Sequence, residues 1–206
     1  MKKVVTLILI LLVVWMSGCA VAPFNAPHTA RSLGEGKSNI NLSVIPRGLE
    51  YSTGVDEDID VGVGVEVHLA PMFTGWMKYS MSNNREGGST ALLSGLFYSD
   101  GIYNSTSKGY YFGPILSYRA GSAEWYLATK YNHVYWEAGE NQVKDENNDL
   151  VFSIDPVSHD FGYFQVNAGL SYWFSDGFNT DLSALCLKMD EQKPACVPML
   201  GFGWSF

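Results

Sequence analysis

The sequence predicts an all-β fold, an antiparallel up-and-down transmembrane β-barrel of about ten strands. Three observations support this prediction. Apolar and polar residues alternate with a period of two from Ser38 to the C-terminus, several of the alternating segments are long, and glycine recurs opposite the apolar residues. Such alternation is the pattern of β-strands with one apolar and one polar face.

The alternating segments are separated alternately by short turns and by longer polar loops, which is the spacing expected of β-strands. None keeps the 3.6-residue period of an amphipathic helix. Several exceed the roughly five or six residues of a typical globular strand and approach the roughly nine to eleven that a tilted strand needs to cross a membrane. The predicted strands are residues 38–45, 49–55, 59–69, 72–82, 89–98, 109–119, 124–136, 161–174, 177–188 and 197–206.

The polar face of these strands decides which way the apolar face points. In DIDVGVGVEVH (residues 58–68), four valines alternate with glycine, glutamate and histidine. A soluble barrel turns its apolar face inward, whereas a membrane barrel turns it toward lipid. Small residues make room for bulky ones inside a narrow barrel, and aromatic residues at strand ends, such as Tyr110 and Trp125, are typical of interfacial girdles. The sequence therefore favours an apolar exterior.

The N-terminus has the layout of a signal peptide. Lys2 and Lys3 precede an apolar run over residues 4–14, and small residues lead to Cys19. We predict a signal peptide over residues 1–18, a flexible lipid-anchored tether over 19–37, rich in Ala, Pro and Gly, and a barrel domain over 38–206. Cleavage after Ala22 is the alternative, and it would remove Cys19.

Two short motifs resemble those of known bacterial envelope proteins. MSGC (residues 16–19) resembles a lipobox, which implies that Cys19 is acylated and that the lipoprotein export machinery is a partner. Ala20 then implies delivery to the outer membrane. LGFGWSF (residues 200–206) resembles the C-terminal strand of bacterial outer-membrane β-barrels. That resemblance implies that Trp204 and Phe206 form a signal for the barrel-assembly machinery and that the protein lies in the outer membrane.

If the final strand runs toward the periplasm, the longer loops all lie on the other side of the membrane, and we expect them to be extracellular. Short periplasmic turns and long external loops are typical of such barrels. The longest loop, residues 137–160, carries Asp145, Glu146 and Asp149, which we expect to be solvated and loosely bridged by divalent cations to lipopolysaccharide. We expect contacts with outer-membrane lipid and lipopolysaccharide and a monomeric state.

Composition and cysteine content agree with an exported protein. Charged residues make up 17% of the chain, against roughly 25% in soluble domains, and a net charge of −8 argues against nucleic-acid binding. Cys186 and Cys196 predict a disulfide, with two free buried thiols as the alternative. We expect no metal site, because two cysteines without a nearby histidine do not make a zinc site.

The polar faces identify side chains that point into the barrel. We predict that they cross-link and fill the interior, with a narrow polar conduit as the alternative. The residues assigned inward are Glu66, His68, Lys78, Arg119 and Lys130, together with Asn132, Gln165, Asn167 and Asp181.

The predicted role is structural or one of surface interaction, because the sequence contains no cofactor signature and no catalytic residue is assigned. His159 lies between Ser158 and Asp160, but adjacent strand residues point to opposite faces, so no catalytic triad is expected. The alternatives are a small-solute channel, a lipocalin-like lipid carrier, and an enzyme acting on outer-leaflet lipid.

The lipobox generates the first testable prediction. Replacing Cys19 with alanine removes the acylated thiol, so labelling by a radioactive fatty acid is expected to be lost. Unchanged signal-peptide processing and unchanged labelling of the Cys19→Ala variant would contradict the acylation.

Overall fold

The computed structural model of the protein describes residues 22–24, 29–68, 70–101, 105–139, 141–144, 150–154, 156–175, 177–188 and 194–206. The predicted signal peptide, Cys19 and the acidic residues Asp145, Glu146 and Asp149 lie outside the described residues. Among the described residues, no helix is long and apolar enough to cross a membrane.

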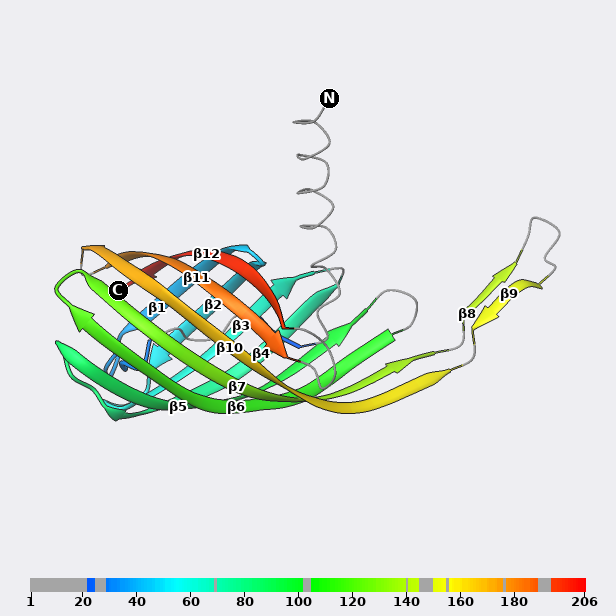
Figure 1. Ribbon diagram of the computed structural model, residues 1–206, viewed down its shortest axis with the longest axis horizontal. Coiled ribbons are helices and arrows are strands. Elements are labelled where there is room, and N and C mark those ends of the chain that lie inside the picture. The colour runs from blue at the N-terminus through cyan, green and yellow to red at the C-terminus, as the bar shows by residue number, and fades with distance from the viewer. Residues whose placement is uncertain are drawn as a thin grey trace, which may run out of the picture.

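Ten antiparallel strands close into a barrel in the order β1, β12, β11, β10, β7, β6, β5, β4, β3, β2 (Figure 1). Apart from the closing pair, β1 and β12, each barrel strand pairs with the barrel strands before and after it in the sequence; β8 and β9 lie outside the barrel. The predicted up-and-down barrel is therefore confirmed. The barrel strands are β1 (Ser38–Ile45), β2 (Arg47–Gly54), β3 (Ile59–Val67), β4 (Pro71–Ser82), β5 (Gly87–Asp100), β6 (Ser105–Ala120), β7 (Ala123–Ala138), β10 (Val157–Ser175), β11 (Phe178–Lys188) and β12 (Ala195–Ser205).

The barrel closes where the last strand pairs with the first. Asn39 faces Ser205 and Leu42 faces Phe202 across this seam. Just beyond the strand end, the Ser38 amide donates to the Phe206 carbonyl at 2.8 Å and the Phe206 amide returns a bond of 2.9 Å to the Ser38 carbonyl. Closure leaves no open sheet edge, which a strand protein in lipid requires.

The two rims of the barrel differ. The rim with the short β2–β3, β4–β5, β6–β7 and β10–β11 connections and the C-terminus is called the turn end here. The opposite rim, with the connections that follow β1, β3, β5, β7 and β11, is called the loop end. A disulfide joins Cys186 to Cys196 near the loop end, between β11 and β12.

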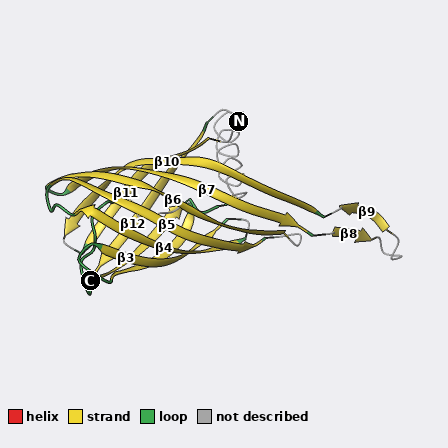
Figure 2. Ribbon diagram, turned by 90° about the horizontal axis from the view of Figure 1, so that it is seen from below, coloured by secondary structure: helices red, strands yellow, loops and turns green. Residues whose placement is uncertain are grey.

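One wall of the barrel is taller than the other. β6, β7 and β10 have 16, 16 and 19 residues, whereas β1, β2 and β3 have 8, 8 and 9. Beyond the tall wall, β8 (Asn141–Lys144) and β9 (Leu150–Ile154) form a separate two-stranded hairpin (Figure 2). These residues were predicted to belong to a loop, because runs of four and five residues are too short to show a clear period.

The outer face is apolar, as the alternation predicted. Large apolar side chains are exposed around the whole wall, for example Leu96 at 68% and Val63 at 61%. Aromatic rings meet near the turn end, where Phe178 stacks on Phe174 at 5.6 Å and packs on Trp204 at 5.3 Å. A contiguous apolar band with aromatic rims is the surface that a bilayer covers.

Glycines on the inner face accommodate the large inward rings. A Cβ atom at Gly62 would lie 2.4 Å from the Trp76 indole, and one at Gly95 would lie 2.4 Å from the Tyr111 ring. Both rings are buried. The glycines of the polar face therefore allow bulky side chains to fill a narrow interior.

The seam generates a prediction for Phe206. Phe206 is 69% exposed on the outside of the barrel, so Phe206→Asp places a charge on the apolar outer surface beside the closing strand pair. On the lipid face of a membrane barrel such a charge disfavours assembly. We expect the fraction of protein that runs as the heat-sensitive folded form in electrophoresis to fall severalfold. Phe206→Leu is the matched control and should assemble nearly as the wild type; equal assembly of the Asp variant would contradict the role of the ring.

Candidate functional site in the barrel lumen

The described part of the predicted tether lies inside the barrel. Residues 22–24 and 29–34, called the lumenal segment here, contact inward side chains of β3, β4, β6, β7 and β10. Ala22 and Ala30 are fully buried, and Phe24 and Arg31 are nearly so. These residues were predicted to be a flexible tether; they are ordered by contacts with distant parts of the chain, which local composition does not reveal.

The lumenal segment leaves the lumen at the turn end and continues through a tight turn into β1. Gly34 and Gly36 have positive φ angles of 88° and 74°, which glycine adopts without a steric penalty. The Gly36 amide donates to the Gly54 carbonyl at 3.0 Å, and the Gly54 amide donates to Lys37 at 2.9 Å. A Cβ atom at Gly54 would lie 2.0 Å from the Gly34 carbonyl oxygen, so glycine is required for this close approach.

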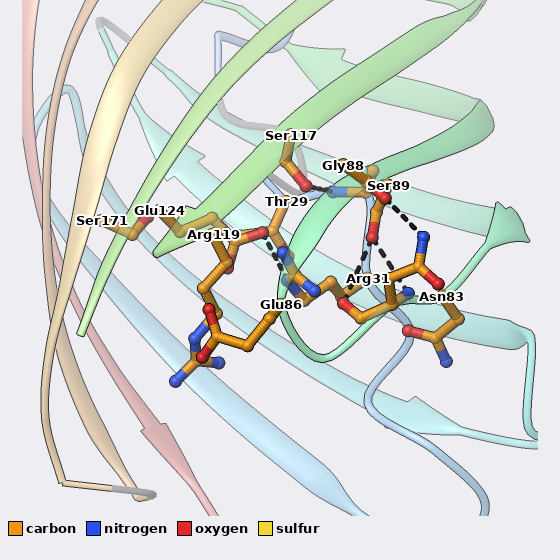
Figure 3. Close-up of polar contacts among 12 residues, drawn as sticks. Thr29, Arg31, Asn83, Glu86, Gly88, Ser89, Ser117, Arg119, Glu124 and Ser171 are labelled. Carbon is orange, nitrogen blue, oxygen red and sulfur yellow. Dashed lines mark hydrogen bonds and ion pairs between the residues drawn. The ribbon is translucent and has the colours of Figure 1, made fainter. Parts of the chain in front are cut away.

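At the turn end, the segment forms a buried ion pair with the wall. Arg31 Nε lies 3.0 Å from Glu124 Oε1, with only 9% and 0% of the two side chains exposed (Figure 3). Arg31 also donates from Nη2 to the Gly87 carbonyl at 3.1 Å. A buried charge is tolerated only when it is paired and hydrogen-bonded, and Arg31 meets both conditions.

A second buried pair, Lys78 and Asp60, holds the backbone of the segment. Lys78 Nζ lies 2.9 Å from Asp60 Oδ2 and donates to the carbonyls of Thr29, at 3.2 Å, and Arg31. Asp60 accepts from the Leu33 amide at 3.0 Å. The pair thus satisfies backbone groups that enter the lumen without a strand partner.

Two serines of the wall bind the same stretch. Ser80 Oγ donates to the Ala30 carbonyl at 2.7 Å, and the Ala30 amide donates to Ser117 Oγ at 3.3 Å. Ser80 lies on β4 and Ser117 on β6, with only β5 between them, so two strands of the same part of the wall hold Ala30.

Nearer the loop end, the wall binds the backbone of residues 23 and 24. The Phe24 amide donates to Glu66 Oε2 at 2.9 Å, and Gln165 Nε2 donates to the Phe24 carbonyl at 3.1 Å. Lys130 Nζ donates to the Pro23 carbonyl at 2.8 Å and lies 4.6 Å from the centre of the Tyr111 ring.

Apolar contacts complete this upper attachment. The Phe24 ring packs against Leu185 and Met199, which are themselves buried, and meets the His68 ring edge-on at 5.1 Å. His68 Nε2 lies 2.9 Å from Glu66 Oε2. Burying a phenylalanine side chain contributes about 1.5–3 kcal/mol, so Phe24 is a strong apolar anchor for the segment.

Among the described residues, the turn end of the barrel contains a hollow. A hollow of about 710 Å³ is lined there by Arg31, Arg119, Glu86, Glu124 and Trp173, among others. Deeper in the lumen, between Leu33, Glu50, Trp76 and Asp181, the space falls to about 80 Å³. That volume holds two or three waters at roughly 30 Å³ each.

The structure places Glu66, His68, Lys78, Arg119 and Lys130, all predicted to point into the lumen, on the inner side of the wall, and Asn132, Gln165, Asn167 and Asp181 are buried as well. Glu66, Lys78 and Lys130 contact the lumenal segment directly, and His68 does so through its ring. Arg119 lies at the turn end, where its guanidinium is 5.2 Å from the centre of the Trp173 ring.

Four charged residues of the site were not predicted from the sequence: Arg31, Glu50, Asp60 and Glu124. Asp60 shares the strand face of Gly62 and Glu66, so alternation was a usable signal for it. Arg31 lies in a stretch without periodicity, and no local signal indicated that it is buried.

His133 and His159, the described histidines outside the lumen, are surface groups. His159 stacks on Trp136 at 5.8 Å, and His133 lies 3.0 Å from Asp160 Oδ1 while 33% of its side chain is exposed. Within the described ranges, no cluster of three or more His, Cys, Asp or Glu side chains has the arrangement of a metal site.

The known proteins that resemble this chain are solved structures. No family model matches the chain, and no curated protein sequence matches it. The N-terminal β-barrel domain of Pseudomonas aeruginosa OprF is 13% identical, with a TM-score of 0.38, over 84% of this chain and 99% of that one. Yersinia pestis Ail, the attachment invasion locus protein, is 15% identical with a TM-score of 0.40 over 84% and 99% of the two chains.

Ail in a phospholipid bilayer nanodisc is 16% identical to this chain, with a TM-score of 0.41, over 84% of this chain and all of that one (100%). These similarities concern the barrel fold and carry no statement about activity.

The buried ion pair generates a stability prediction. Arg31→Met leaves the Glu124 carboxylate buried without its cation, which costs about 3–5 kcal/mol. Glu124→Gln likewise leaves the Arg31 guanidinium buried without its anion. We expect each variant to unfold at lower urea concentration in detergent, measured by fluorescence or by loss of heat-sensitive mobility.

The double variant Arg31→Met/Glu124→Gln removes both charges and should lose clearly less than the sum of the single variants. Arg85→Met changes an exposed arginine of the same end and serves as the control, with an effect within about 0.5 kcal/mol. Additive losses in the double variant would contradict a coupled pair.

Proposed function

We propose that this protein is an integral β-barrel of the bacterial outer membrane, with a sealed lumen and a structural or surface-interaction role. The observation that carries the proposal is the combination of an apolar exterior with an interior occupied by the protein itself. Outside, rings such as Phe112 and Phe164 are more than half exposed; inside, Arg31, Lys78 and Lys130 bind partners within the lumen.

The filled lumen argues against a solute channel. A conducting pore needs a continuous water path, whereas here Trp76 and Tyr111 are buried in the lumen and the inner cavity is about 80 Å³. The same interior argues against a lipocalin-like carrier, because that function requires an apolar cavity. Charged groups such as Glu66 and Lys130 are unsuited to solvating an acyl chain.

A surface role is supported by the tall side of the barrel. β7 and β10 remain paired up to Ala138 and Val157, and the β8–β9 hairpin lies beyond them, well clear of the barrel (Figure 1). Val157 to Asp160 are exposed on this wall. A projecting ribbon of this kind suits contact with lipopolysaccharide, outer-membrane lipid or a protein outside the barrel.

The remaining elements of the proposal concern biogenesis. Acylation of Cys19, transport by the lipoprotein export machinery, and insertion by the barrel-assembly machinery through Trp204 and Phe206 would deliver a monomer to the outer membrane with its loop end outward. Trp204 and Phe206 are both exposed on the outer surface of the closing strand, where an assembly factor would reach them.

Conductance in planar bilayers tests the sealed lumen. We expect the purified wild-type barrel, verified as folded by its heat-dependent mobility, to give no steady conductance. A variant lacking residues 23–34 loses the lumenal segment and should show discrete openings. Steady wild-type conductance as large as that of this variant would contradict the proposal and favour a channel.

The matched control is a deletion of residues 141–154, which removes the β8–β9 hairpin and leaves the lumen unchanged. This variant should remain as silent as the wild type. A release of the wild-type protein into buffer after removal of its lipid would instead indicate a soluble carrier and would overturn the membrane placement.

A further inference from the structure

The direction in which the lumenal segment runs is fixed by its contacts. Leu33 binds Asp60, which follows the turn-end start of β3, whereas Phe24 binds Glu66, one residue before the loop-end limit of that strand. Phe24 also contacts His68, which lies just beyond β3 at the loop end. Going backward along the chain, the segment therefore passes from the turn end to the loop end.

The distance to Cys19 is short compared with the length of the lumen. Two residues, Ala20 and Val21, lie between Cys19 and Ala22, so the two Cα atoms are three steps apart along the chain and at most about 11 Å apart. The stretch of β3 from Asp60 to Glu66 alone measures roughly 20 Å at 3.3 Å per residue. Cys19 therefore cannot return to the turn end, and the filled lumen offers no path back.

We infer that the chain threads its own barrel and presents the acylated Cys19 at the loop end, so that its acyl chains insert into the outer leaflet of the outer membrane. The inference rests on the proposed function, which places the loop end at the cell surface. It differs from the arrangement that a simple tether implies, in which the lipid lies in the inner leaflet and residues 20–37 cross the periplasmic side.

The contacts of Pro23 argue for retention of Cys19. Cleavage after Ala22 would create a charged amine on Pro23, which is among the fully buried residues and whose carbonyl accepts from Lys130 Nζ at 2.8 Å. A second cation at this position would be desolvated beside the lysine ammonium, which is costly. It would also remove Ala22 from the buried apolar cluster that includes Met72 and Tyr163.

An epitope placed at three positions of the full-length protein tests the inference. The first variant carries the epitope between Ala20 and Val21, the second between Glu146 and Asn147 in the β8–β9 connection, and the third between Asp56 and Glu57 in the turn end. Antibody binding is compared on intact cells and on cells with a permeabilised outer membrane. Fatty-acid labelling and heat-dependent mobility verify that each variant is acylated and folded.

We expect the first and second epitopes to be bound on intact cells and the third only after permeabilisation. If the second is bound on intact cells but the acylated first one only after permeabilisation, the threading is wrong and the proposed function stands. If the second also requires permeabilisation and the third does not, the orientation is reversed, and the proposed function and the inference both fail.

Engineered cysteine pairs test the threading without an insertion. Phe24→Cys with His68→Cys and Ala30→Cys with Ser117→Cys place two thiols at a contact on each of the two levels of the lumen. A short bifunctional thiol reagent should link each pair, because it tolerates separations that a direct disulfide does not, and the link changes mobility in gels. In the matched controls the wall cysteine is moved to the neighbouring residue that points outward, Val67→Cys in place of His68→Cys and Leu116→Cys in place of Ser117→Cys; Val67 and Leu116 are both about half exposed. Folded protein in which neither lumenal pair links would overturn the inference.

Discussion

Charge buried inside the barrel has to be neutralised by partners that are also inside it, and the rest of the lumen depends on this constraint. Among the described wall residues that are buried, five are acidic and two are basic: Glu50, Asp60, Glu66, Glu124, Asp181, Lys78 and Lys130. Strand neighbours satisfy part of this charge, since Asp181 accepts from Tyr126 and Ser171, both at 2.7 Å. The lumenal segment supplies the rest, with the Arg31 guanidinium and a series of backbone amides.

The apolar exterior and the charged interior are two results of the same alternation. Each barrel strand sends successive side chains to opposite faces, so a chain that covers its outside with Val, Leu and aromatic residues must place its remaining residues inside. Glycine and serine reduce the volume of that inner set, which lets Trp76 and Tyr111 fit beside Gly62 and Gly95. The space that remains is wide enough for one extended chain, and the N-terminal segment occupies it.

This division explains which parts of the structure could be predicted from the sequence. Strand positions and inward residues such as Glu66, Lys78 and Lys130 follow from alternation, which is a local signal. The burial of Arg31 and Phe24 depends on strands that lie far along the chain; Gln165 of β10, for example, is 141 residues from Phe24. The residues next to Arg31 and Phe24 in the sequence show no periodic alternation of apolar and polar side chains. A wall with more inward acids than bases was the available indication that a cation must come from elsewhere.

The segment also connects walls that do not touch each other. In the closed order of strands, β5 and β6 lie between β4 and β7, so backbone ladders link Asp60 and Lys78 to Glu124 only around the circumference. Arg31 joins these walls directly, because its backbone is held by Lys78 and its side chain by Glu124. Phe24 repeats the arrangement nearer the loop end between Glu66 and Gln165. Two such connections across the interior resist changes in the cross-section of the barrel, so the segment contributes rigidity to the wall as well as filling the lumen.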